Sequence, residues 1–118
     1  MERQPIDYAN VAPEALTAML GLERVIRASD LEPLLLELVR LRASQINGCA
    51  RCIEMHAKDA RALGEAQERL DLVASWTEAP SFTRRERAAL GWCEVLTRVA
   101  EVDSAAVDNA FRKVGEEF

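Results

Sequence analysis

Residues 33–64 decide the fold, and they read PLLLELVRLRASQINGCARCIEMHAKDARALG. The first half predicts a helix that is N-capped by Asp30 and carries leucines at helical spacing. Those leucines are Leu31, Leu34, Leu35, Leu38 and Leu41. Asn47-Gly48 ends this helix, and a second helix is predicted to begin near Cys49 and to end at Gly64. The turn lets the second helix fold back against the first, so the stretch predicts a packed helix pair.

The composition favours helices elsewhere in the chain as well. The 118 residues include only five Gly and four Pro, the two residues that helix interiors tolerate least. Helical spacing predicts four more helices, over residues 13–28, 65–75, 83–100 and 103–114. A chain of this length buries one core without disulfides. We therefore predict an all-α fold, with a single domain over residues 1–118 built as a bundle of about six helices.

The helix predicted at residues 83–100 has a clear start. Thr83 and Glu86 fit a capping box, in which each side chain accepts a hydrogen bond from a backbone N–H. The two tryptophans are expected in the core, and the predicted inward stripe of this helix consists of Ala88, Trp92, Val95 and Val99. Cys93 has no motif around it and is predicted to be a small buried side chain. Asp103 is predicted to cap the helix that follows.

The charge balance excludes several kinds of partner. Twenty acidic residues against 15 basic ones give a formal net charge of −5, which disfavours nucleic acid because phosphate binding needs clustered Lys and Arg. No apolar run reaches the roughly 20 residues of a membrane span, and residues 1–10 lack the apolar core of a secretory signal. We expect a cytoplasmic protein, in which cysteines serve chemistry, metal binding or packing rather than structural disulfides.

Two cysteines and the only histidine share one face of the second helix. Cys49, Cys52 and His56 lie at positions i, i+3 and i+7, which fall within a narrow arc. The same face carries Ile53, Ala60 and Leu63, whereas the opposite face carries Arg51, Glu54, Lys58 and Arg61. The face with the sulfurs and the imidazole is therefore predicted to point inward.

Position along that helix favours thiol chemistry. The N–H groups at a helix N-terminus stabilise an anion, which lowers a thiol pKa from about 8.5 to roughly 3.5–7.5, and Cys49 lies at such a start. His56 lies one turn beyond Cys52 and is predicted to act as its base, directly or through one water. The two sulfurs are also close enough to form a disulfide.

Glu37 is the fourth candidate. It flanks the apolar stripe of the first helix, where partial burial of a carboxylate favours proton exchange near neutral pH. We predict that it forms the far end of a proton relay. The alternative is a surface ion pair with Arg40 at i+3.

A zinc site is a second interpretation of the same residues. Cys49, Cys52 and His56 would supply three ligands, and Glu37 or Cys93 a fourth. The chain lacks a second close pair of ligands and its only His is already used, so thiol redox chemistry ranks first and we predict neither a metal nor a cofactor. A third interpretation is a non-catalytic helical oligomer or disulfide-exchange module.

Residues 37–64 resemble the core of the alkylhydroperoxidase D-like branch of the carboxymuconolactone decarboxylase family. The shared features are a Glu twelve residues before the first Cys, the Ser-Gln-Ile-Asn-Gly-Cys turn, Cys-x-x-Cys and a His four residues on. The likeness continues through Trp76 and residues 82–92. It implies an all-helical antioxidant enzyme that reduces organic hydroperoxides and assembles as a homotrimer or as a hexamer.

The resemblance also implies roles for single residues. Cys52 would attack the peroxide and become a sulfenic acid, and Cys49 would resolve it to a disulfide. Glu37 and His56 would move the protons, and an external dithiol or thiol-transfer reductant would regenerate the pair. The family's decarboxylases lack this pair, which disfavours decarboxylation here. Arg51 stands where alkylhydroperoxidase D proteins have a relay His, so the implied relay is shorter.

Overall fold

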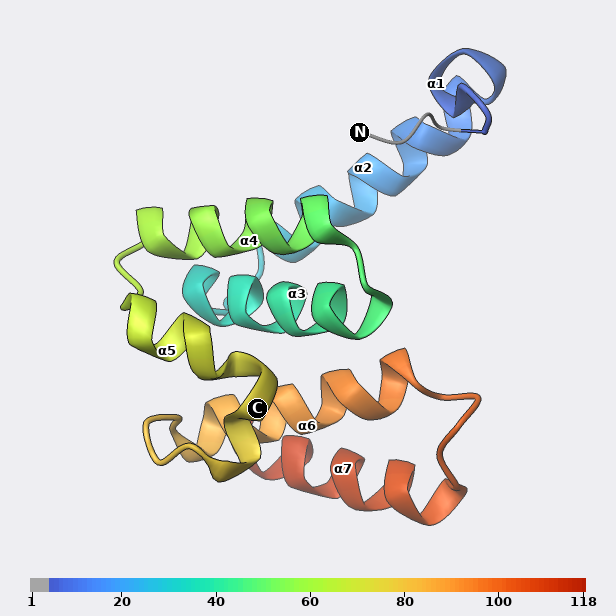
Figure 1. Cartoon of the computed structure of the whole chain (residues 1–118). Helices are drawn as coiled ribbons and strands as arrows, with labels where there is room; N and C mark the ends of the chain where they lie inside the picture. The colour runs from blue at the N-terminus through green and yellow to red at the C-terminus, as the bar shows by residue number, and fades with distance from the viewer. Residues whose placement is uncertain (1–4) are drawn as a thin grey trace. The chain divides into compact units, whose positions relative to one another are not determined.

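The computed structural model describes residues 5–118, which contain seven α-helices, one 3-10 helix and no strand (Figure 1). The predicted all-α class is confirmed. The helix beyond the six expected is α1 (Tyr8–Val11), a single turn before α2 (Pro13–Arg27). No helix among residues 5–118 is long and apolar enough to cross a membrane. Contacts group the chain into two compact units that divide after Leu31, and the single domain 1–118 stays a prediction.

The first unit consists of α1 and α2. Pro13 opens α2, as predicted, because the first turn of a helix does not use the N–H that Pro lacks. Neither helix contains a buried residue. The apolar side chains of Met19, Leu20, Leu22 and Val25 are all exposed. This unit therefore has no buried core of its own.

The second unit holds the core and is centred on α3. Its elements are α3 (Pro33–Asn47), α4 (Ala50–Ala62), α5 (Gln67–Leu72), η1 (Val73–Glu78), α6 (Arg84–Thr97) and α7 (Ser104–Glu117). Helix α3 packs against α4 and against α6, while α7 packs on α6, and Figure 1 shows α4 and α6 on opposite sides of α3. The largest fully buried side chains are Leu38 of α3, Val73 of η1 and Leu90 of α6.

The helix pair predicted from residues 33–64 is present, with one correction at its start. Glu32, not Asp30, is the N-cap of α3. The residue before a proline is held in extended backbone, and Glu32 has φ −60° and ψ 129°, so the helix begins at Pro33. Gly48 ends α3 with a φ of 69°, and Gly64 follows α4 with a φ of 100°; both glycines take the left-handed conformation that a helix end requires.

Helix α6 confirms the predicted start and corrects the predicted stripe. Thr83 and Glu86 form the capping box. The buried residues of α6 are Ala89, Leu90 and Cys93, whereas Val99 lies beyond the helix and is exposed. The predicted stripe is turned toward α7, where the rings of Trp92 and Phe111 lie 5.6 Å apart. Because α6 lies between two helices it has two apolar faces, and the periodicity singled out the wrong one.

The last helix begins as predicted and runs further. Asp103 caps α7 through its side chain, which accepts from the backbone N–H of Ala106 at 2.8 Å. The helix continues to Glu117 rather than to about residue 114. Arg85 of α6 holds this end, because it donates to the Glu117 carbonyl and lies 3.7 Å from the centre of the Phe118 ring.

An arginine ties the start of α6 to the segment before it. Arg69 of α5 binds Glu65 at 2.8 Å, pairs with Glu86 and lies over the ring of Phe82. Burial raises the pKa of the Glu86 carboxyl, but hydrogen bonds from Arg69 and the Thr83 backbone outweigh burial and hold that pKa below its ordinary value. Glu86 therefore serves both the cap and this ion-pair cluster.

Loss of the capping hydroxyl is expected to destabilise the chain. The Thr83→Ala variant leaves an N–H of α6 without its acceptor, so the free energy of unfolding falls by about 1 kcal/mol. Urea denaturation followed by circular dichroism measures this. Thr77→Ala, which removes an exposed hydroxyl, is the matched control. Equal stability of the two variants would contradict the role of the cap.

The lowered pKa of Glu86 predicts a pH dependence. The ionised carboxylate stabilises the fold above the unfolded pKa of Glu, about 4.3, and this stabilisation is lost as the pH falls through the lower folded-state pKa. Glu86→Gln keeps a residue able to accept in the capping box. Wild type should exceed this variant in unfolding free energy at about pH 6, and the difference should shrink toward about pH 3. A difference that stays constant would refute the assignment.

Candidate active site

Cys49 and Cys52 lie at the N-terminal end of α4 and are joined by a disulfide, with their Cα atoms 5.3 Å apart. Cys49 is the N-cap, and its sulfur accepts from the backbone N–H of Cys52 at 3.3 Å. The N–H of Cys49 donates to the carbonyl of Ser44 at 3.1 Å, which closes the turn at Gly48. The sulfur of Cys49 thus lies at the positive end of the helix dipole, where a thiolate is stabilised.

Glu37 and His56 meet between α3 and α4. The Nδ1 atom of His56 lies 2.8 Å from Oε2 of Glu37, although the two residues are 19 positions apart. Glu37 is buried, with 4% of its surface exposed. Arg40 donates to the other carboxylate oxygen, Oε1, at 3.0 Å. The ion pair with Arg40 is therefore present, although Glu37 is buried rather than on the surface, and its other oxygen faces the imidazole. The relay role of Glu37 stays a prediction.

The contact with Glu37 determines how the imidazole of His56 is oriented. When Glu37 is ionised its carboxylate only accepts hydrogen bonds, and Nδ1 is then the nitrogen that donates to it. In the neutral ring the Nε2 atom then has an open lone pair, which is what a base needs. Cys52 lies one turn before His56 on the same helix. The role of His56 as the base for Cys52 stays a prediction.

The predicted faces of α4 agree with the structure except at one end. The charged residues Arg51, Glu54, Lys58 and Arg61 are all exposed. On the other face Ala60 is buried and Ile53 packs against the core. Leu63 is half exposed, because it is the C-cap and has left the helical backbone conformation.

The structure does not gather the ligand set proposed for zinc. Cys49 and Cys52 are bonded to each other, and a disulfide sulfur is not the thiolate that zinc binds. Among residues 5–118, the group that could hold a metal is Glu37, His56 and Asp59, with one ligand atom from each within 4.8 Å of the others. Asp59 was missed by the sequence analysis, although its position three residues after His56 places it on a neighbouring part of the helix surface.

Cys93 is a buried side chain of α6, as predicted. Its sulfur donates to the Val39 carbonyl at 3.4 Å. Burial is the main cause of a raised pKa of the Cys93 thiol, and a hydrogen bond with Thr97 opposes this only in part. A thiol that stays protonated is a poor nucleophile.

Comparison with known proteins places the chain in a family. The sequence model of the Carboxymuconolactone decarboxylase family matches residues 13–95. YdfG of Bacillus subtilis, an uncharacterised protein, is 33% identical over 115 residues, which cover 98% of this chain and 77% of YdfG. YnjA of Escherichia coli, also uncharacterised, is 32% identical over 91 residues. That match covers 77% of this chain, which spans about half the length of YnjA (47%).

A solved structure is similar over nearly the whole chain. ATU0492 of Agrobacterium tumefaciens is a protein of unknown function for which an AhpD-type role in antioxidant defence has been suggested. Its crystal structure superposes with a TM-score of 0.86 and 40% sequence identity, covering 98% of this chain and 78% of that one. The chain belongs to the carboxymuconolactone decarboxylase family, as the motif at residues 37–64 predicted.

Proposed function

We propose that the chain is a thiol-dependent peroxidase that reduces organic hydroperoxides. The observation that carries this proposal is the Cys49–Cys52 disulfide at the start of α4, on the same helix as the imidazole that Glu37 orients. In its dithiol form such a pair stores two electrons, and it releases them to an oxidant when the disulfide forms. The suggested antioxidant role of ATU0492 points the same way.

The chemistry begins at Cys52. Its thiolate attacks one oxygen of the hydroperoxide, the O–O bond breaks, and the alkoxide leaves as an alcohol after taking a proton. Cys52 is then a sulfenic acid. The thiol of Cys49 attacks that sulfur, a disulfide forms, and the hydroxyl leaves as water. One hydroperoxide is reduced for each dithiol oxidised.

Glu37 and His56 serve the proton transfers in this proposal. His56 takes the proton of the Cys52 thiol at Nε2 and returns a proton to the leaving oxygen. Glu37 stabilises the imidazolium that forms in between, because its carboxylate faces Nδ1 at 2.8 Å. Arg40 keeps this carboxylate in place from the other side. The relay needs no residue at the position of Arg51.

An external dithiol or thiol-transfer protein completes the cycle. The reductant attacks the Cys49–Cys52 bond, a mixed disulfide forms, and a second thiol of the reductant releases the reduced pair. We further propose that the chain acts in the cytoplasm, where such reductants are abundant, and that it assembles with itself as a homotrimer or a hexamer.

Peroxide should close the disulfide in the reduced protein. After one equivalent of cumene hydroperoxide, peptide mass spectrometry is expected to find a bond between Cys49 and Cys52 and none at Cys93. The Cys49→Ser variant should accumulate a sulfenic acid at Cys52 that dimedone traps. Cys93→Ser is the control and should behave as wild type. A dithiol that survives peroxide, or a sulfenic acid on Cys93, would rule out the proposed pair.

Removal of the base should slow the reaction without unfolding the protein. His56→Gln is expected to lower kcat/KM for cumene hydroperoxide by about 100-fold, and Glu37→Gln by less, because the imidazole remains. Glu54→Gln, an acid-to-amide change on the exposed face of the same helix, is the control. Circular dichroism verifies the fold of each variant. Wild-type rates for His56→Gln would exclude the base assignment.

A further inference from the structure

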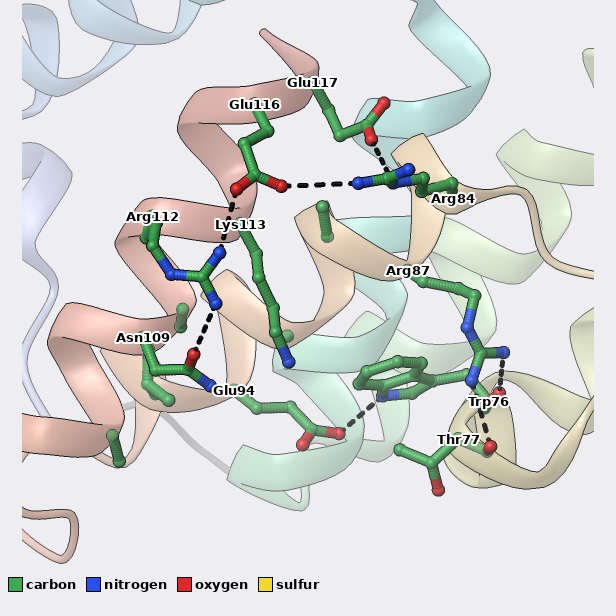
Figure 2. A pocket seen from close by; sticks show the side chains of 15 residues that line it. Trp76, Thr77, Arg84, Arg87, Glu94, Asn109, Arg112, Lys113, Glu116 and Glu117 are labelled. Atoms are coloured by element: carbon green, nitrogen blue, oxygen red, sulfur yellow. Dashed lines mark hydrogen bonds and ion pairs between the residues drawn. The ribbon is translucent and has the colours of Figure 1, made fainter.

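A cavity of about 800 Å³ lies between η1, α6 and α7 (Figure 2). None of the four residues proposed for the peroxidase reaction lines it. Its apolar wall is formed by Trp76, Ala88, Gly91, Val95, Ala106 and Ala110. Cavities that bind small organic molecules fall in the range of roughly 300–1,000 Å³ and combine an apolar wall with a few polar groups.

Trp76 forms a flat part of the wall. Its Nε1 donates to Glu94 at 2.8 Å, which holds the indole in one orientation. Gly91 faces the ring, and a Cβ at that position would lie 3.7 Å from the indole. Both residues line the cavity, and a side chain at position 91 would contact the indole. The cavity therefore offers an aromatic surface to a ligand.

Most charged groups of the lining neutralise each other. Arg84 pairs with Glu116 at 3.4 Å and with Glu117 at 2.8 Å, and Arg112 pairs with Glu116 at 2.8 Å. Arg87 donates to the backbone carbonyls of Trp76, Thr77 and Ala79, so its guanidinium holds η1 in place. These groups are committed to the fold of the second unit.

Lys113 is the exception. Figure 2 shows its side chain extending from α7 toward Glu94 and the indole of Trp76. Glu94 already accepts from Trp76 and from Arg42, each at 2.8 Å. Among residues 5–118, Lys113 makes no hydrogen bond or ion pair. Lys113, which is exposed, thus adds an ammonium group without an ion-pair partner to a cavity that has an apolar wall.

We infer that this cavity binds a small amphipathic carboxylic acid, whose carboxylate pairs with Lys113 while its hydrocarbon chain or ring lies against Trp76 and Val95. The carboxylate supplies the negatively charged partner that the Lys113 ammonium lacks. The hydrocarbon part removes the indole and the alanines of α6 and α7 from water. This inference does not rest on the proposed peroxidase activity, because no residue of the relay takes part.

A medium-chain fatty acid that carries a dansyl group tests the site, with its methyl ester as the uncharged counterpart. Fluorescence titration of the whole chain should show the acid binding about tenfold more tightly than the ester. Lys113→Met keeps the length of the side chain and should weaken the acid by the same factor while leaving the ester unchanged. Ala88→Leu fills part of the cavity and should weaken both. Lys58→Met, on the exposed face of α4, is the control.

Three results would overturn the inference. The first is equal affinity of wild type for the acid and the ester, and the second is unchanged affinity of Lys113→Met for the acid. The third is an Ala88→Leu variant that alters the subunit number in sedimentation but not the binding of the acid, which would assign the cavity to a second copy of the chain. Lys113 is exposed, so its variant is expected to fold and decides the matter even if Ala88→Leu does not fold.

Discussion

Glu37 is a carboxylate buried between α3 and α4, and its two oxygens each have one cationic or donor partner. A buried charge is costly unless it is hydrogen-bonded and paired, and here Arg40 and His56 meet that requirement from two different helices. The same contact that satisfies the carboxylate orients the imidazole. It therefore links the packing of α3 on α4 to the chemistry available beside Cys52.

Helix α3 explains why the candidate site is built where it is. It packs with α4 on one side and with α6 on the other, and this packing buries Leu35, Leu38 and Leu41. The glycine turn at its end brings α4 back alongside it and places Cys49 at the N-cap of that helix. Local backbone chemistry thus positions the sulfurs, and core packing positions the acid and the base.

Local patterns predicted much of this arrangement. Three of the predicted features involve residues only a few positions apart, where spacing alone determines geometry. They are the capping box of Thr83 and Glu86, the cap at Asp103 and the glycine helix ends. The helical face that joins Cys52 to His56 is local in the same sense. Glu37 was selected from its place on an apolar seam, and the fold brings it to His56.

Contacts between distant parts of the chain were not predictable in this way. Glu94 binds Arg42, which is 52 positions away, and Trp76, which is 18 away, and no periodicity within a helix encodes such pairs. The stripe chosen for α6 was wrong for the same reason, because one sequence pattern cannot tell which of two neighbouring helices each apolar face will meet. The start of α3 was misplaced because the effect of Pro33 on Glu32 outweighs the capping preference of Asp30.

The central claim is that the pair at the start of α4 transfers two electrons to a hydroperoxide. A single-turnover experiment tests it most directly: reduced protein, free of external thiol, is mixed with excess cumene hydroperoxide, and the alcohol formed is quantified by chromatography. The account predicts one alcohol per chain in wild type and none in Cys52→Ser. No alcohol from wild type, or the same yield from Cys52→Ser, would contradict it.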